Sequence, residues 1–342
     1  MVSFRSESDS SVVDDSALGL RVNHGRANRE FPSGDQSLLM GDALPGAYDP
    51  QLRKLRGVVL LGGTVRGTAL RTAIGRSVMD LPVETGRTLL DDWREQCVAL
   101  ARAMNIKGLP VRLILDRAAP EPRHGWVADE RVVLSVERDP IEYRGTGGVL
   151  RDLVPCYEPD DFLIVGNAAQ LLRAGLPQLA GALSAVCTDA AVISHADGTP
   201  SGLMMVRCQC LAELPSVGFV DMKEQALPSI AKRHHVQVVQ WPRASGLPVR
   251  TLADYIKALR RHHLDLAGVD EAAAPLEEWR PAFVIAEDAA EVRPGARIHN
   301  SVVLNGARVE EGAVVVGSVV CGGAVVRRGR MAVDQLILKG GR

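Results

Sequence analysis

Aliphatic residues recur at a regular spacing near the C-terminal end, and this constrains the fold more than any other feature of the chain. They follow one another every five or six positions, with glycine and other small residues between them. The series is Val292, Ile298, Val303, Val309, Val315, Val320 and Val326. A hexapeptide-like repeat of this kind predicts a left-handed β-helix of about two to three triangular coils, with the aliphatic side chains pointing inward. A β-meander with many glycine turns is the alternative.

Before this repeat, apolar runs alternate with amphipathic segments. The run 57–61 (GVVLL) is typical of a buried parallel strand. Segment 88–105 places its apolar residues on one face at helical spacing, and 111–116 is again an apolar run. Strand, helix and strand in this order predict a right-handed βαβ unit.

The same alternation continues as far as residue 263. We expect further strands at 131–137, 160–167, 190–195, 202–211 and 236–241, and further helices at 146–154, 168–183, 223–234 and 251–263. The predicted fold class is therefore α/β, with a Rossmann-like domain whose mainly parallel sheet carries helices on both faces. Too few regular βα pairs follow one another to predict a βα barrel.

Changes in composition divide the chain into four parts. Residues 1–48 are rich in Ser, Asp, Gly and Arg without periodicity, which predicts a disordered N-terminal extension. The α/β domain is expected at 49–265 and the β-helix at 282–342. A polar segment at 266–281, which contains Ala, Pro and Glu, is expected to link them.

Charge and cysteine usage exclude several classes of protein. With 40 Lys+Arg against 41 Asp+Glu, the net charge of -1 argues against nucleic acid or a membrane surface as partner. The six cysteines form no CxxC pair and are expected to be buried free thiols; Cys208 and Cys210 would share one face of the strand 202–211. No apolar stretch is long enough to span a bilayer. We therefore expect a cytoplasmic protein.

A glycine-containing loop follows the first strand. Glycines let a backbone approach phosphate groups closely, so that its N–H groups donate to phosphate oxygens. This segment contains Gly62, Gly63, Gly67, Thr68, Leu70 and the tripeptide Leu81-Pro82-Val83. With this spacing it resembles the opening of the sugar-1-phosphate nucleotidyltransferases, of the glucose-1-phosphate adenylyltransferase and mannose-1-phosphate guanylyltransferase type. The resemblance continues through the later motifs and the β-helix.

The resemblance implies nucleotide-binding positions in this loop, at Gly62, Gly63, Gly67 and Thr68. The family's loop arginine falls at Ala69 and its phosphate-binding lysine at Val78. Other arginines are therefore the candidate phosphate contacts, although none is assigned a catalytic role. They are Arg66, Arg71, Arg76 and Arg243.

Residues 142–152 (EYRGTGGVLRD) resemble the family's turn beside the nucleotide base. The matching residues are Glu142, Gly145, Thr146 and Gly148, while Gly147 replaces an alanine. The resemblance implies that these four residues belong to the nucleotide-binding site.

Both carboxylates that hold Mg²⁺ in the family are replaced. Strand 160–167 resembles the family's strand that ends Asn-Gly-Asp, but Ala168 stands at the position of the Asp. The segment 222–228 (MKEQALP) and Trp241 fit the family's late core, and Arg243 stands at the second Asp position. The stretch that carries the sugar-binding hairpin in the family is also much shorter here. We therefore expect no metal site.

Three functions are consistent with these residues. The favoured one is a non-catalytic nucleotide-sugar pyrophosphorylase-like protein, a scaffold or regulatory subunit that binds a nucleotide or nucleotide-sugar and oligomerises through its β-helix. The alternative is an active Mg²⁺-dependent enzyme that joins a sugar 1-phosphate to an NTP and releases pyrophosphate. Its metal ligands would have to come from Asp80, Glu84, Glu142 or Asp189. An acyltransferase acting through the β-helix, with His299 as base, is the third.

Overall fold

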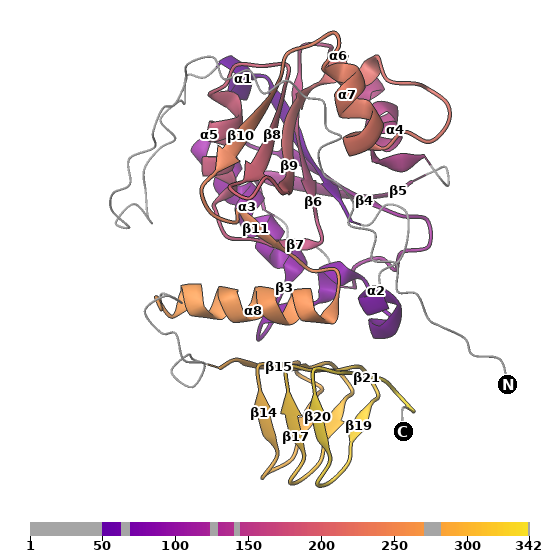
Figure 1. Ribbon diagram of the computed structural model, residues 1–342, viewed down its shortest axis with the longest axis vertical. Coiled ribbons are helices and arrows are strands. Elements are labelled where there is room, and N and C mark those ends of the chain that lie inside the picture. The colour runs from indigo at the N-terminus through magenta and orange to yellow at the C-terminus, as the bar shows by residue number, and fades with distance from the viewer. Residues whose placement is uncertain (1–49, 63–68, 124–128, 140–143, 270–281, 341–342) are drawn as a thin grey trace, which may run out of the picture. The chain divides into compact units, whose positions relative to one another are not determined.

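A computed structural model describes residues 50–62, 69–123, 129–139, 144–269 and 282–340 (Figure 1). Contacts divide the chain into Met1–Asp42 and Ala43–Arg342, and all described residues belong to the second unit. The predicted N-terminal extension and most of the predicted linker fall outside the described residues. The predicted domain boundaries therefore stay predictions.

In the described residues, a seven-stranded sheet forms the centre of the α/β part. Its strands are β1 (Leu55–Leu61), β4 (Leu109–Leu115), β5 (Val132–Arg138), β6 (Phe162–Asn167), β8 (Ala190–His195), β9 (Pro200–Arg207) and β10 (Val236–Trp241). Their order across the sheet is β10-β8-β9-β6-β1-β4-β5. Neighbouring strands run parallel, except that β9 is antiparallel to both β6 and β8. The predicted mainly parallel sheet is confirmed.

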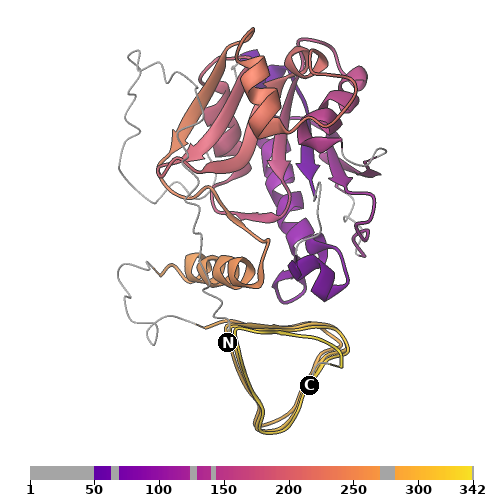
Figure 2. The same ribbon diagram turned by 45° about the vertical axis from the view of Figure 1, so that its right-hand side comes forward.

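Helices pack on both faces of this sheet (Figures 1 and 2). They are α1 (Pro50–Arg53), α2 (Ala69–Ile74), α3 (Leu89–Ala103), α4 (Gly145–Leu153), α5 (Leu176–Ser184), α6 (Cys208–Ala212), α7 (Leu227–Ile230) and α8 (Leu252–Leu266), with short turns η2 (Val78–Asp80), η3 (Val154–Cys156) and η4 (Met222–Ala226). Strand β1 contributes side chains to the hydrophobic cores on both faces of the sheet. Val58 and Leu60 lie in the core with α3, α5 and α8, whereas Val59 lies in the core with α4, α6 and α7. None of the described helices is long and apolar enough to cross a membrane.

The helix predicted at 168–183 is wrong in its first half. Gln170–Leu172 form strand β7, which pairs antiparallel with β11 (Gly246–Pro248). Helix α5 begins only at Leu176, where Pro177 occupies the first turn. Proline fits the start of a helix because the N–H that it lacks would have no partner there.

The strand predicted at 202–211 is too long, because the chain leaves the sheet after Arg207. The Cys208 N–H donates to the Asp161 carbonyl at 2.8 Å, and α6 begins there. Cys208 and Cys210 are both buried, but in a helix instead of a strand. All six thiols are free, as expected, yet Cys156 and Cys187 are exposed. The expectation of burial is wrong for these two, because both lie at chain turns.

The C-terminal strands stack in three parallel sheets. The first contains β12 (Val284–Ala286), β15 (Ser301–Val303), β18 (Val319–Val320) and β21 (Leu336–Ile337); the second contains β13 (Glu291–Val292), β16 (Arg308–Val309) and β19 (Val325–Val326); the third contains β14 (Arg297–His299), β17 (Val314–Val316) and β20 (Met331–Val333). Ile285 pairs with Val302 and Val302 with Val319, so each coil takes 17 residues. Viewed along the stack, the coils are triangular (Figure 2). This arrangement fits the predicted β-helix, whose handedness stays a prediction.

A coil of 17 residues explains why one aliphatic step in each coil is five residues and the other two are six. The five-residue step spans the corner that contains Asn300, Gly317 or Asp334, whose φ values are 46°, 57° and 52°. Such left-handed residues turn the chain sharply, and Gly, Asn and Asp tolerate them best. The sharp turn at this corner therefore makes one side of each coil one residue shorter than the other two.

The inward direction predicted for the aliphatic series is confirmed for its later members. Val303, Val309, Val315, Val320 and Val326 are each 0% exposed. Ile298 is only partly buried, and the least buried member of the series is Val292, with 42% exposure. It lies in the first coil, where β13 pairs with β16 on only one side, so no further coil covers it.

The first sheet of the β-helix packs on the α/β part. Val302, Leu304, Val319 and Cys321 belong to the same core as α3 and α8. The Phe283 ring stacks on the His263 ring of α8, with centroids 5.1 Å apart. The other two sheets therefore form the outer sides of the coil.

Candidate functional site

The strand order identifies where a ligand would bind. From β1, the chain adds β4 and β5 on one side and then β6 on the other side. The order in which strands are added therefore reverses between β1 and β6. In open α/β sheets, ligands bind outside the carboxyl ends of the strands at such a switch point. The predicted loop begins there, at the end of β1. Of its residues, Gly63, Arg66, Gly67 and Thr68 lie outside the described residues.

Glycine is required at position 62 because the backbone there passes close to β4. Its N–H donates to the Ile114 carbonyl at 2.8 Å. A Cβ at this position would lie 2.7 Å from a methyl group of Leu115 and 3.2 Å from one of Leu113. The glycine therefore allows the backbone to pass close to the neighbouring strand. A phosphate contact at Gly62 stays a prediction.

Ala168, at the expected metal position, is part of the hydrophobic core. It is 0% exposed, its N–H donates to the Leu61 carbonyl at 3.0 Å, and its carbonyl accepts from the Trp93 indole N–H at 2.9 Å. Val78, at the expected lysine position, is likewise buried, in η2. A charge at either position would have to enter an apolar environment, which is unfavourable unless the charge is paired.

Two of the candidate arginines are held in ion pairs. Arg71 of α2 pairs with Asp116, directly after β4. Arg76, which is 6% exposed, binds both carboxylate oxygens of Glu287 in the β-helix. Arg243, after β10, is exposed, and no ion pair to it is found within the described part of the chain. Arg243 is thus the most available cation among the described candidates.

The glycine turn at the start of α4 binds another part of the chain. Gly145 has a φ of 72°, and the N–H groups of Gly147 and Gly148 donate to the Val220 carbonyl at 2.9 and 3.3 Å. The Thr146 hydroxyl accepts from the Met222 N–H at 3.1 Å. The turn therefore anchors the segment that precedes η4. Glu142 lies outside the described residues.

The buried guanidinium of Arg144 also binds the segment that precedes η4. It donates to Asp152 at 2.8 and 2.9 Å and to the Gly218 carbonyl at 2.6 Å. The hydrogen bonds to Asp152 raise the pKa of Arg144 above its usual value, although burial opposes them. No local pattern predicts this role of Arg144, because its partners Pro215 and Gly218 lie more than seventy residues further along the chain.

The described carboxylates among the possible displaced metal ligands each have their own local partners. Asp80 is 2% exposed and accepts twice from the Arg123 N–H. Glu84 binds His262 at 2.9 Å and Arg87 at 3.0 Å. Asp189 lies just before β8, at the amino end of that strand, whereas Ala168 follows the carboxyl end of β6. Among the described residues, no group of three or more His, Cys, Asp or Glu side chains could hold a metal.

The pKa values of two of these carboxylates reflect their partners. Burial alone would raise the pKa of Glu84, but the His262 hydrogen bond and the charge of Arg87 hold it below its usual value. Burial likewise opposes the hydrogen bonds from His235 and Arg207 that lower the pKa of Asp189. Both groups are therefore ionised partners in local ion pairs.

His299, the base that an acyltransferase would need, is exposed on β14, on an outer side of the coil.

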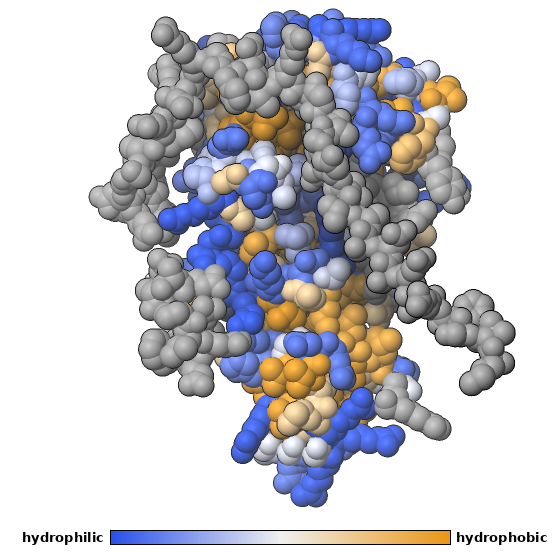
Figure 3. Space-filling model, viewed as in Figure 1, coloured by the Kyte–Doolittle hydropathy of each residue, from blue (hydrophilic) through white to orange (hydrophobic). Residues whose placement is uncertain are grey.

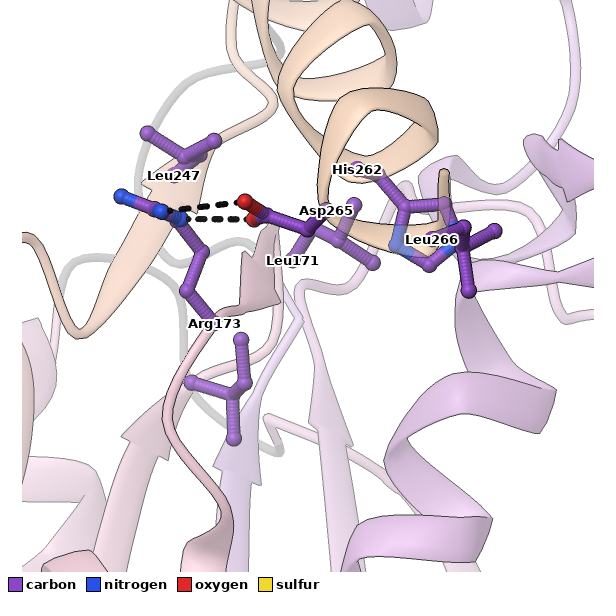
Figure 4. Close-up of a pocket in the computed structure, with 7 residues that line it drawn as sticks. Leu171, Arg173, Leu247, His262, Asp265 and Leu266 are labelled. Carbon is purple, nitrogen blue, oxygen red and sulfur yellow. Dashed lines mark hydrogen bonds and ion pairs between the residues drawn. The ribbon is translucent and has the colours of Figure 1, made fainter. Parts of the chain in front are cut away.

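Two cavities lie away from the predicted site. One, of about 180 Å³, lies between α8 and the β7–β11 pair, where Arg173 and Asp265 form an ion pair at 3.0 Å (Figure 4). It is lined by Leu171, Leu172, Arg173, Leu247, His262, Asp265 and Leu266. The other, of about 390 Å³, lies at the amino ends of β6 and β8, and its lining includes Lys54, Asp160 and Arg207. Of the predicted site residues, Asp189, one of the possible metal ligands, lines the second cavity.

Comparison with known proteins gives limited similarity. No protein-family model matches the chain, and no curated protein matches it. Among solved structures, HddC from Yersinia pseudotuberculosis complexed with GMP-PN is 16% identical, with a TM-score of 0.43 over 61% of this chain and 100% of that chain. The Mycobacterium tuberculosis Rv0371c homolog from Mycobacterium sp. strain JC1 is 18% identical, with a TM-score of 0.41 over 61% and 98%. TM-scores below 0.5 identify neither a family nor an activity.

Proposed function

We propose that this chain is a non-catalytic, nucleotidyltransferase-like protein that binds a nucleotide or nucleotide-sugar at the carboxyl edge of its sheet. It would act as a scaffold or regulatory subunit. The observation that carries the proposal is the buried methyl group of Ala168, at the position where the resemblance implies a metal carboxylate. The free thiols fit a reducing compartment, so the cytoplasm is the proposed location.

The described residues do not fit a magnesium ion at this edge. Mg²⁺ prefers carboxylate oxygens and phosphate, and in phosphoryl transfer it neutralises the charge that develops on the phosphates. Here one expected ligand is the core residue Ala168 and the other is Arg243, whose charge repels a cation. The same charge attracts a phosphate group. The arrangement therefore favours binding over turnover.

The test is a nucleotide titration combined with a turnover assay. ATP, GTP, CTP, UTP and dTTP are titrated with and without Mg²⁺, and pyrophosphate release is followed with several sugar 1-phosphates. We expect binding of at least one nucleotide that does not require Mg²⁺, and no pyrophosphate. Mg²⁺-dependent release would establish the active alternative, and failure to bind any nucleotide would remove the binding function.

Arg243 gives the titration a residue-specific control. We expect Arg243→Ala to weaken nucleotide binding about tenfold, which corresponds to about 1.4 kcal/mol. Arg233→Ala removes an arginine that is 70% exposed and pairs with Glu213 elsewhere on the surface. Equal effects of the two changes would show that the binding is not located at the carboxyl edge.

A further inference from the structure

The two outer sides of the β-helix differ in chemistry. On the side formed by β13, β16 and β19, Glu291 pairs with Arg293 at 3.2 Å and with Arg308 at 2.9 Å. Such exposed ion pairs are well solvated and contribute little binding energy. This side is therefore typical of a surface that faces water.

The side formed by β14, β17 and β20 is apolar over two of its three coils. We call it the β17 face; its outward residues are Arg297, His299, Val314, Val316, Met331 and Val333. Met331 is 67% exposed and Val333 is 44% exposed. Figure 3 shows hydrophobic residues gathered on this part of the molecule, with hydrophilic residues around them. Contiguous exposed apolar residues with a polar rim mark interaction sites.

We propose that the β17 face binds the same face of a second copy of this chain. The strands of this face pair in register without a bulge, from Arg297 through Val314 to Met331. Two copies therefore present rows with the same spacing, as a two-fold interface requires. The central coil, with Val314 and Val316, would face its own equivalent.

Charge selects one of the two possible two-fold arrangements. Arg297 and His299 lie in the first coil, and the exposed Asp334 follows β20 in the third. If the axis ran along the stack, the first coils would meet, and Arg297 would face the second copy's cationic row. If the axis runs along the strands, the first coil meets the third, and His299 lies beside the second copy's Asp334. Arg297 then lies opposite the second copy's Met331 instead of another Arg297–His299 row, so the geometry points to reversed coil order.

The size of the face predicts weak association. Three coils about 4.8 Å apart cover only a small patch, below the roughly 800 Å² per partner of a stable interface. We therefore expect a dimer that dissociates at micromolar concentration. The proposal does not depend on nucleotide binding, and a failed titration would leave it intact.

Sedimentation velocity on the full chain over a range of concentrations tests the interface. We expect a concentration-dependent dimer that Met331→Asp abolishes. The matched control is Val325→Asp, which adds the same charge to the same coil at a valine that is 42% exposed on the ion-paired side. A monomer at every concentration, or equal loss of dimer in both variants with unchanged thermal unfolding, would overturn the proposal.

Cross-linking tests the coil order. Arg297→Cys and Met331→Cys are made separately, in a chain whose exposed Cys156 and Cys187 are replaced by Ser. The two variants are mixed with a short thiol cross-linker. Reversed coil order places these two positions opposite each other, while like positions lie two coils apart, about 10 Å along the stack. We expect mixed cross-linked dimers to dominate; a dominance of like pairs would refute the reversed order.

Discussion

Arg76 and Glu287 form a two-point ion pair that joins the α/β part to the first coil of the β-helix. The Nη2–Oε1 distance is 2.7 Å and the Nη1–Oε2 distance is 3.0 Å, between side chains that are only 7% and 15% exposed. Glu287 also accepts from the Asn305 N–H at 2.6 Å. An arginine that the loop spacing suggested as a phosphate contact thus has a structural partner 211 residues away.

Removing one member of this pair should destabilise the chain strongly. Arg76→Met leaves the Glu287 carboxylate buried without its counter-ion, and this type of change costs about 3–5 kcal/mol. The double variant Arg76→Met, Glu287→Met should lose less, because no uncompensated charge remains. Denaturant unfolding of the two variants measures both values.

An exposed pair provides the comparison for this measurement. Lys107 and Glu130 approach to 3.9 Å, with side chains that are 77% and 70% exposed. Lys107→Ala should change the free energy of unfolding by less than about 1 kcal/mol. If Arg76→Met cost no more than Lys107→Ala, the ion pair would not hold the β-helix in place.

Restoring the expected metal carboxylate should damage the protein without creating an enzyme. Ala168→Asp places an acid in a fully buried position next to the Trp93 indole, at a cost of about 3–5 kcal/mol. Arg243→Asp, at an exposed position, should change stability by less than about 0.5 kcal/mol. We expect no pyrophosphate release from either variant or from their combination. A stable Ala168→Asp protein that releases pyrophosphate with Mg²⁺ would contradict this.

The sequence was most informative where the pattern is local. The bounds predicted for β8 and β10 agree with the structure, because each is a short apolar or β-branched run between turns. The β-helix was visible as aliphatic steps of five and six residues, and its 17-residue coil explains them. By contrast, β7 exists only because it pairs with β11, more than seventy residues later. No local pattern predicts such a pairing.

The candidate site was harder to predict for the same reason. Glycines at a turn signal backbone freedom or close approach, but they do not reveal what approaches. At Gly62 it is the neighbouring strand, and at Gly147 it is the Val220 carbonyl. The replacement of metal carboxylates by Ala168 and Arg243 stays a prediction, because it rests on the resemblance alone.

Gly145→Ala tests the structural role of the turn before α4. A Cβ at Gly145 would collide with the Val220 carbonyl, and the φ of 72° is itself unfavourable for alanine. We expect a loss of about 3 kcal/mol or more in unfolding free energy. Gly198→Ala is the matched control, since Gly198 has a φ of 82° and no atom near its Cβ position. It should lose only about 1–2 kcal/mol, and equal losses would show that the Val220 contact is unimportant.

Asp92 should make the stability of the chain depend on pH. Its side chain is 6% exposed; Oδ1 accepts from Arg87 at 3.1 Å, and Oδ2 is buried without a hydrogen-bond partner among the described residues. Burial raises its pKa from 3.8 to about 6, although Arg87 and His262 oppose the shift. Because the folded pKa lies above the unfolded one, the folded state binds more protons between these values. The contribution of Asp92 to stability is therefore lost as the pH rises from about 4 to about 6.

Asp92→Asn measures this contribution directly. The amide keeps an acceptor for Arg87 and removes the buried charge, so the variant should exceed the parent by up to about 3 kcal/mol at pH 8 and match it near pH 4. Denaturant unfolding at intervals between these pH values gives the difference. Glu95→Gln removes a 52% exposed carboxylate from the same arginine, and should change stability by less than about 1 kcal/mol. An Asp92→Asn protein that is less stable than the parent at pH 8 would show that the Arg87 ion pair outweighs the burial of the carboxylate.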